Sequence, residues 1–424
     1  MVNTKFSGYK VAIGMAIVVM FVQGALGTFG VLLPYIISSE GWSVSAVSFM
    51  ATCCNCIVFV MNTIMYKAIS RLGAKKTLLI GIFCCGLHYQ LYGLSTAIWQ
   101  LYLAACVGGV AMGFATNAML SFILTRWFVD KRERTISLAM IPIGFGGTLF
   151  SFISGYAIEL LGSWRMAYHI VGALVWVVAI PIAVIMVKES PASVGELPLG
   201  ATAQVEDNKP KAKVKVSALE EFKTAAFWMM WIGLFLCGFV APGLTQHFTS
   251  ILREGGVEAG AASNYLGIGK LFTAVAFLII GMISGQKNSK KTTYIVVILI
   301  TATVVISCLS LFVIDGQPAS GLMAYVWIAL ISFGFACTSY HIISTFTVMQ
   351  AYGHERYAIL YGVFQGAAMF AGGFGSLGLG VFFDVNGDYR TGLIVYAIIA
   401  IVGMVLVFGA ISSENKRRTR KQLA

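Results

Sequence analysis

The chain has 424 residues, of which 58% are hydrophobic and only 11% are charged. A soluble protein carries about 25% charged residues, so this composition excludes an ordinary soluble domain and indicates a membrane protein. The net charge of +12 at pH 7 is explained by loops that face lipid headgroups, and it gives no reason to expect a nucleic-acid partner.

Twelve stretches are apolar over the roughly 20 residues that a helix needs to cross a bilayer. In chain order they are residues 10–37, 44–68, 77–95, 98–125, 135–160, 166–187, 226–251, 259–284, 293–314, 320–348, 357–382 and 391–411. These runs are continuous, whereas membrane strands are shorter and alternate in polarity. The first run is too long for the core of a signal peptide. We therefore predict an all-α membrane protein with 12 transmembrane helices.

The basic residues predict how the chain faces the membrane. With the N-terminus placed inside, 25 of the 29 Lys and Arg residues fall in inside segments and 3 in outside loops. This bias predicts a multi-pass protein of the cell membrane with both termini cytoplasmic. The remaining cation is Lys270, within the eighth span. All 17 acidic residues lie in inside segments or at the outer edge, so we expect no carboxylate at mid-depth.

A polar segment, residues 188–224, divides six spans from six and is expected to be a cytoplasmic linker. It separates a six-helix bundle in residues 1–187 from a second bundle, with a basic tail, in residues 225–424. The halves resemble each other, as in "MGFAT" at 112–116 and "FGFACT" at 333–338. Parallel repeats of this kind are typical of transporters, whose substrate site lies between the halves at mid-depth.

Several motifs in both halves carry a family resemblance, among them "GTFGVLLPYIISSEGWSVSAVS" (27–48), "RLGAKK" (71–76), "TRWFVDKRERTISLAMIPIGFGG" (125–147), "LTQHFTSILREGGVEAGAAS" (244–263) and "FDVNGDY" (383–389). With them, the chain resembles a major facilitator superfamily transporter of the branch that holds oxalate/formate antiporters and monocarboxylate transporters. The resemblance implies the major facilitator fold, with two six-helix bundles. We expect a monomer and no cofactor.

The resemblance also implies a cytoplasmic motif that acts in conformational change. Arg71, Gly73 and Lys75 match it after the second span, and Arg126 and Arg134 flank the loop after the fourth span. The family's first Gly is replaced by Tyr66, and its Asp is replaced by Ser70. That Asp helps to latch one conformation in relatives, so the sequence leaves the latch in doubt.

Lys270 is the main candidate for the substrate site. A cation at mid-bilayer costs about 2.5–3.5 kcal/mol on insertion scales and usually faces a wet cavity or a partner. An anionic substrate is the natural counter-ion; snorkelling, or pairing with backbone carbonyls, is the alternative. In relatives this span carries a Gly-Arg pair thought to hold the substrate carboxylate, and the pair here is Gly269–Lys270. A nucleotide-binding loop is excluded, because "GIGK" lacks the first Gly and the Ser/Thr of that motif.

Further polar residues within spans are weaker candidates. His247 is expected to donate to a carboxylate or to take up a proton, unless it is simply a packed histidine. The others, for which interhelical hydrogen bonding is the alternative, are Tyr340, His341, Gln365, Asn117, Asn55 and Asn62. The nine cysteines lie in apolar runs and are expected to pack rather than to bind metal. No nucleophile–base set lies at depth, so we expect no enzyme.

These residues predict a secondary transporter that moves a small organic anion by alternating access. One intramembrane cation suits one carboxylate, because a second substrate charge would remain uncompensated. The acid that relatives place one turn before the span 8 cation is Leu266 here, which favours exchange or facilitated transport. A proton-coupled carboxylate symporter and a drug or sugar carrier of the same fold remain the alternatives.

Overall fold

The computed structural model describes residues 6–129, 132–200, 221–284, 290–315 and 321–423. Within these ranges, the side chains of residues 63, 66, 132–134, 137, 281–284, 290–292, 339–342, 345–346, 353–359 and 418–423 are not described. The described residues form helices joined by short turns. Their one isolated β-bridge pairs Phe128 with Leu199.

The first half of the chain forms the N-terminal bundle. Its helices are α1 (Ser7–Gly24), α2 (Gly27–Glu40), α3 (Val44–Leu72), α4 (Ala74–Leu94), α5 (Ile98–Phe114), α6 (Asn117–Trp127), α7 (Arg132–Met140), α8 (Pro142–Leu161), α9 (Trp164–Leu174) and α10 (Ile180–Met186). Four of the predicted spans are each built from more than one segment. A π-helical turn, Val175–Ala179, joins α9 to α10. A short 3₁₀ turn, Pro191–Val194, follows.

The second half forms the C-terminal bundle. Its helices are α12 (Ala225–Glu254), α13 (Ala259–Ser284), α14 (Lys290–Ile314), α15 (Met323–Asn386) and α16 (Arg390–Leu423). The 64 residues of α15 would extend about 96 Å if straight. However, Ser344 donates a hydrogen bond to Gln365, and the rings of Tyr352 and Phe364 stack with centroids 5.5 Å apart. The chain therefore reverses direction within α15, which supplies both the tenth and the eleventh spans.

The predicted fold class is confirmed. In the part of the chain that the structure describes, 11 helical stretches are long and apolar enough to cross a membrane. The tenth predicted span appears as a shorter apolar stretch, Met323–Thr338, within α15. Apart from the tenth, which ends before the predicted residue 348, these stretches begin and end within about six residues of the predicted positions, because runs of apolar side chains and the polar turns between them fix the ends.

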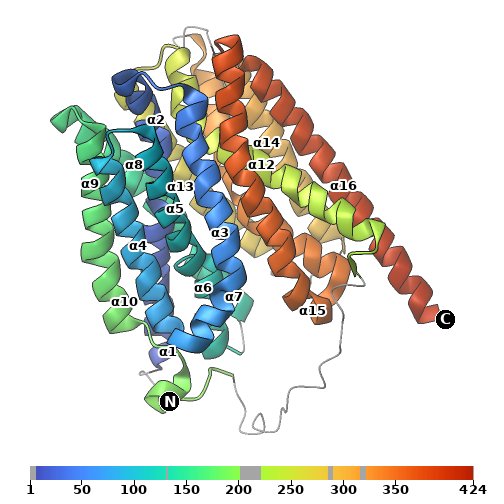
Figure 1. Ribbon diagram of the computed structural model, residues 1–424. Helices are drawn as coiled ribbons and strands as arrows, with labels where there is room; N and C mark the ends of the chain where they lie inside the picture. The colour runs from blue at the N-terminus through green and yellow to red at the C-terminus, as the bar shows by residue number, and fades with distance from the viewer. Residues whose placement is uncertain (1–5, 130–131, 201–220, 285–289, 316–320, 424) are drawn as a thin grey trace.

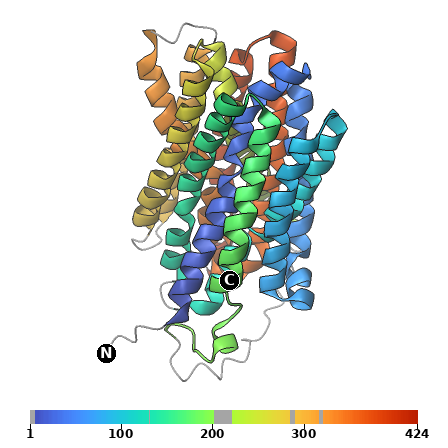
Figure 2. The ribbon, with the colours of Figure 1, turned by 90° about the vertical axis from the view of Figure 1, so that its left-hand side faces the viewer.

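The two bundles stand side by side (Figures 1 and 2), and in Figure 1 α12 and α16 tilt away from the helices of the N-terminal bundle. The termini lie toward the lower end of Figure 1, which we call the linker end; the opposite end, where α3 and α13 begin, is the far end. Near the far end α3 and the later part of α15 are in contact, and toward the linker end their ribbons diverge. The bundles are therefore joined most closely at the far end.

The segment between the bundles is fixed at both of its ends. The backbone N–H of Val129 donates to the Leu199 carbonyl at 3.0 Å, and the N–H of Leu199 donates to the Trp127 carbonyl at 2.9 Å. The indole of Trp127 in turn donates to the Lys188 carbonyl at 3.2 Å. At the other end, Arg417 of α16 pairs with the buried carboxylate of Glu221 at 2.8 Å. Each end is thus held by the bundle next to it in the chain. The boundaries at residues 188 and 224 stay a prediction.

Candidate functional site

Lys270 lies near the middle of α13, where that helix crosses α8 of the other bundle. At this crossing point α8 has a glycine, Gly147, and therefore no side chain. A methyl group on Gly147 would lie 3.1 Å from Cγ and 3.2 Å from Cβ of Lys270. The aliphatic part of Lys270 is therefore packed directly on the backbone of the N-terminal bundle, although the residue belongs to the C-terminal one.

The ammonium group of Lys270 has two weak partners, both from α15. Its Nζ donates to Sγ of Cys337 at 3.6 Å and lies 5.0 Å from the centre of the Phe333 ring. The ring can come this near because Gly269 has no side chain: a methyl there would lie 2.8 Å from Phe333 Cδ1. A thiol is a weak acceptor, so the charge of Lys270 is only lightly compensated.

No ion pair involving Lys270 occurs among the described side chains. Glu159 of α8 lies beside Gly260, where an added methyl would be 2.6 Å from its Oε1. Gly260 precedes Lys270 by ten residues on α13, which is about 15 Å along a helix. The prediction of a cation at depth without its own carboxylate therefore agrees with the described geometry.

Cys337 also contacts Thr245 of α12. The Thr245 hydroxyl lies 2.9 Å from the carbonyl of Ala241 and 3.4 Å from the sulfur of Cys337. Three helices of the C-terminal bundle thus meet around the sulfur of Cys337: α13 with Lys270, α15 with Cys337 itself and α12 with Thr245.

His247 occupies a separate, fully buried position on α12. Its Nε2 lies 2.9 Å from the Ser376 carbonyl and 3.2 Å from the Ser48 hydroxyl, and its Nδ1 lies 3.3 Å from the hydroxyl of Tyr389. A carbonyl only accepts, so Nε2 carries the proton and Nδ1 accepts from Tyr389. None of these partners touches Lys270. Because Ser48 belongs to α3, His247 joins the two bundles.

Further hydrogen bonds cross between the bundles in the half nearest the far end and at mid-depth. The threonines donate to backbone carbonyls: Thr249 to Gly30, Thr52 to Gly373 at 2.9 Å and Thr148 to Gly267 at 2.9 Å. In addition, the backbone N–H groups of Val44 and Ser45, in the first turn of α3, donate to the carboxylate of Asp384 at 3.1 and 2.9 Å. The far end is therefore closed by contacts that any separation of the bundles must break.

Comparison with known proteins identifies the architecture. The family model "Major Facilitator Superfamily" matches residues 15–376. The chain belongs to the major facilitator superfamily. Its fold is similar to the crystal structure of a bacterial homologue of the human lysosomal transporter Spinster, captured inward-facing and unoccupied, with a TM-score of 0.72 and 14% identity over 98% of this chain and 99% of that one.

Relatives of similar sequence are transporters. An uncharacterized transporter of Saccharomyces cerevisiae is 22% identical over 58% of this chain, which spans only 38% of that protein's length. The MFS-type transporter YcxA of Bacillus subtilis, also uncharacterized, is 21% identical over 83% of this chain and 82% of its own. A gallate transporter of Pseudomonas putida is 23% identical over 73% of each chain. These likenesses establish a superfamily transporter and leave its branch and its substrate open.

The superfamily's cytoplasmic motif lies at the linker end. Gly73 has a φ of +86°, a conformation that favours glycine, and its open side faces Glu189, whose Oε1 accepts the backbone N–H of Lys75 at 2.9 Å. The ammonium of Lys75 donates to the Val184 carbonyl at 2.6 Å. Where the family's Asp is replaced by Ser70, a carboxylate from the linker thus binds the start of α4.

The remaining arginines of the motif lie on the surface or outside the described side chains. Arg71 and Arg126 are exposed, and the guanidinium of Arg126 lies 4.3 Å from the centre of the Phe122 ring. Arg134 falls among the side chains that are not described. Among the described residues of the motif, Gly73 and Lys75 are therefore the ones that contact Glu189 of the linker.

The other predicted site residues are spread over several helices. Gln365 accepts from Ser344 within α15, and Asn62 donates to the sulfur of Met369 at 3.4 Å across the bundle interface. Asn117 begins α6, directly after the break in the fourth span. Asn55 donates to the Ala51 carbonyl one turn earlier in α3.

Tyr340 and His341 follow Cys337 on α15, but their side chains lie outside the described ones. The sequence analysis missed Cys337, Phe333 and Thr245. A thiol, a phenyl ring and a hydroxyl in apolar spans look like packing residues, and only the "FGFACT" repeat drew attention to this part of the chain.

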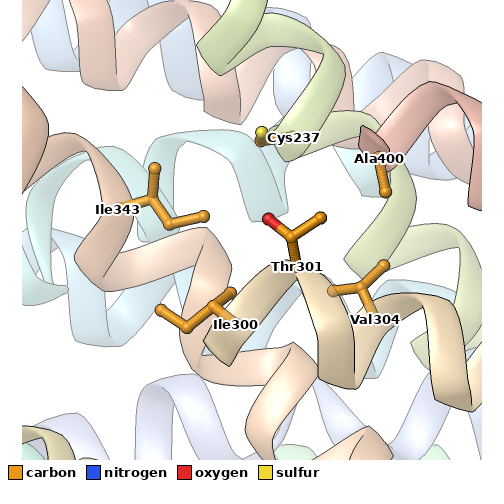
Figure 3. A pocket seen from close by; sticks show the side chains of 6 residues that line it. All are labelled: Cys237, Ile300, Thr301, Val304, Ile343 and Ala400. Atoms are coloured by element: carbon orange, nitrogen blue, oxygen red, sulfur yellow. The ribbon is translucent and has the colours of Figure 1, made fainter. Parts of the chain in front are cut away.

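A small pocket lies inside the C-terminal bundle, among α12, α14, α15 and α16. Figure 3 shows its lining: Cys237, Ile300, Thr301, Val304, Ile343 and Ala400. It has room for about one water molecule and no charged group in its wall. It shares no residue with the surroundings of Lys270, so it is not a counterpart of the predicted anion site.

Proposed function

We propose that this superfamily transporter moves a small organic anion, a monocarboxylate in the simplest case, and that Lys270 is its counter-charge. The observation that carries the proposal is the contact set of Lys270: an ammonium at mid-depth, touching the other bundle, held by a thiol and a ring rather than by a carboxylate. A carboxylate would form a shorter and stronger charge-assisted bond with this group than the thiol does.

The position of Lys270 suits alternating access. Its stem rests on α8 at Gly147, and the neighbouring turn is as close, since a methyl on Gly144 would lie 2.9 Å from the Lys270 carbonyl and 2.6 Å from the backbone nitrogen of Ala274. Rocking of the bundles changes this contact directly. An anion bound at Lys270 is therefore placed where its binding can favour one arrangement of the bundles over the other.

Charge supports an orientation with the linker end in the cytoplasm. The ends of α3, α6 and α16 that lie toward this end carry the basic residues Arg71, Arg126 and Arg417, as the positive-inside rule expects of cytoplasmic segments. Since most of the described hydrogen bonds between the bundles lie at mid-depth and toward the far end, the conformation is an inward-facing one under this orientation. The inward-facing Spinster homologue, similar in fold, is compatible with that assignment.

The kinship with a gallate transporter also supports an anion, because gallate is a carboxylate. It also widens the size range of the expected substrates, since gallate carries an aromatic ring beside its carboxylate. We place the protein with the oxalate/formate and monocarboxylate branch on the Gly269–Lys270 pair. Exchange or facilitated transport is preferred over proton symport, because no described Asp or Glu contacts Lys270.

Counterflow in proteoliposomes tests the proposal. Vesicles loaded with benzoate, lactate or gallate are diluted into the same labelled anion, and uptake is compared between the parent and Lys270→Gln. We expect saturable uptake of at least one anion and its loss in the variant, with partial retention in Lys270→Arg. Lys223→Gln, which neutralises an exposed lysine at the linker end, is the matched control. Undiminished counterflow in Lys270→Gln would refute the assignment.

A further inference from the structure

The hydrogen atoms around Lys270 can be placed by elimination. The Ala241 carbonyl can only accept, so the Thr245 hydroxyl, 2.9 Å away, donates its single proton to it. The oxygen of Thr245 is then an acceptor for its other neighbour, the thiol of Cys337 at 3.4 Å. The thiol proton therefore points at Thr245, away from Lys270.

This arrangement turns the sulfur lone pairs of Cys337 toward the ammonium of Lys270, 3.6 Å away. The groups form a chain in which each donates to the next: Lys270 to Cys337, Cys337 to Thr245, and Thr245 to Ala241. Every dipole in it has the same sense, with its negative end toward the cation. The thiol is therefore fixed as an acceptor by Thr245 and is not free to turn its proton toward Lys270.

We infer that Cys337 is a positioning residue, which acts as the resting acceptor of the Lys270 ammonium in the empty carrier and is displaced by the substrate carboxylate. The inference rests on the proposed function for its substrate, but the hydrogen-bond chain itself does not. A sulfur acceptor holds the ammonium in place and yields readily to an oxygen anion, since thiol sulfur accepts more weakly than carboxylate oxygen. Phe333 supports the cation from its ring face and cannot compete for its protons.

This role makes the two simplest replacements act in opposite directions. In Cys337→Ser, a hydroxyl oxygen competes more strongly for the ammonium, so the half-saturation concentration of the anion should rise. In Cys337→Ala, the resting acceptor is gone, so that concentration should fall. The worth of a single hydrogen bond implies a change of about two- to tenfold in each direction. A purely structural role would make both variants worse in the same sense.

The transport arm of the test uses the anion that gives Lys270-dependent counterflow. Half-saturation concentrations are measured for the parent, Cys337→Ala and Cys337→Ser. Cys237, which lines the small pocket of Figure 3, supplies matched controls as Cys237→Ala and Cys237→Ser, both expected to leave the concentration unchanged. The order Ala below Cys below Ser supports the inference. Equal values, or a shift of both Cys337 variants in one direction, overturns it.

The second arm needs no substrate, so it separates this inference from the proposed function. The S–H stretching band of Cys337 is isolated as the infrared difference between the parent and Cys337→Ala. In Thr245→Val the acceptor of that proton is removed, and the band should move to the higher frequency of a free thiol. An unmoved band overturns the chain even if Lys270 proves essential. A shifted band supports it even if none of the three anions is transported.

Discussion

Removal of the Asp384 carboxylate should loosen the far-end closure of the two bundles. At the start of α3, the backbone N–H groups of Val44, Ser45 and Ala46 have no helical partner. The hydroxyl of the N-cap residue Ser43 accepts one of them, from Ala46 at 3.2 Å. The other two, on Val44 and Ser45, are accepted by Asp384 of the opposite bundle.

The size of the effect follows from these two bonds. Loss of a helix-capping side chain costs about 1 kcal/mol, and hydrogen bonds to charged groups are worth about 1.5–3 kcal/mol each. Water replaces part of this, because Ser45 is only half-buried and its hydrogen bond to Asp384 is exposed. We therefore expect Asp384→Ala to shift the balance toward far-end opening by about 1–3 kcal/mol, or roughly 5- to 150-fold.

Hydrogen exchange at the amides of Val44 and Ser45, followed in the protein held in lipid nanodiscs, measures this shift. Exchange should accelerate by that factor in Asp384→Ala. The matched control is Asp388→Asn at the same end, because Asp388 accepts the N–H of Arg390 within its own loop at 3.1 Å. Unchanged protection in Asp384→Ala, or equal acceleration in the control, would refute the reasoning.

Three further variants test separate contacts. Arg417→Ala leaves the buried carboxylate of Glu221 without its bidentate partner and should cost about 3 kcal/mol of stability in thermal unfolding. Gly144→Ala should slow transport and lower the melting temperature, because α8 and α13 touch there, whereas Gly362→Ala, with open space around it, should be neutral or mildly stabilising. Burial raises the pKa of the Asp315 carboxyl. The folded protein then binds that proton more tightly than the unfolded chain, so stability falls as pH rises above about 3.9, the ordinary value. Asp315→Asn should remove this part of the acid-side dependence of the melting temperature.

Each of these has an outcome that contradicts it. For Arg417, the exposed neighbour Lys416 supplies the control, and equal destabilisation by Lys416→Ala would point to a general charge effect. For the glycines, a harmless Gly144→Ala would mean that the two helices part without cost. For Asp315, an acid-side profile identical to the parent would assign the dependence to other carboxyls.

The sequence predicted the spans because hydrophobicity and length fix them locally. Lys270 could be identified in the same way, since a charge within an apolar span is costly whichever helices pack around it. The reversal within α15 is different. In the sequence, only the polar segment "QAYGHERYA" at 350–358 marks the reversal. Its polarity predicted the division into two spans, but the helical hydrogen bonding of α15 continues through this segment.

The partners of the candidate residues could not be read from the chain, because they depend on how helices meet. Cys337 lies 67 residues from Lys270, and Thr245 lies 92 residues from Cys337. His247 was singled out because its ring can donate and accept hydrogen bonds, and it does form them. Its partners Ser48 and Tyr389 place it in the contact between the bundles. Its part in substrate binding stays a prediction.

The surroundings of Lys270 bear on how transport is coupled. A carrier that returns empty must take its cation through an arrangement closed at both ends, where the thiol of Cys337 and the ring of Phe333 are the described partners of the charge. Burial of a charge that is only lightly compensated raises the barrier to reorientation of the empty carrier by a few kcal/mol. A bound carboxylate neutralises the charge of Lys270 and removes this part of the barrier. The loaded carrier should therefore reorient faster than the empty one, which is the kinetic signature of an exchanger. Concentrative uptake driven by a pH gradient alone, without internal anion, would contradict this ordering. If His247→Ala then abolished that uptake, the proton would be assigned to the histidine that joins the bundles.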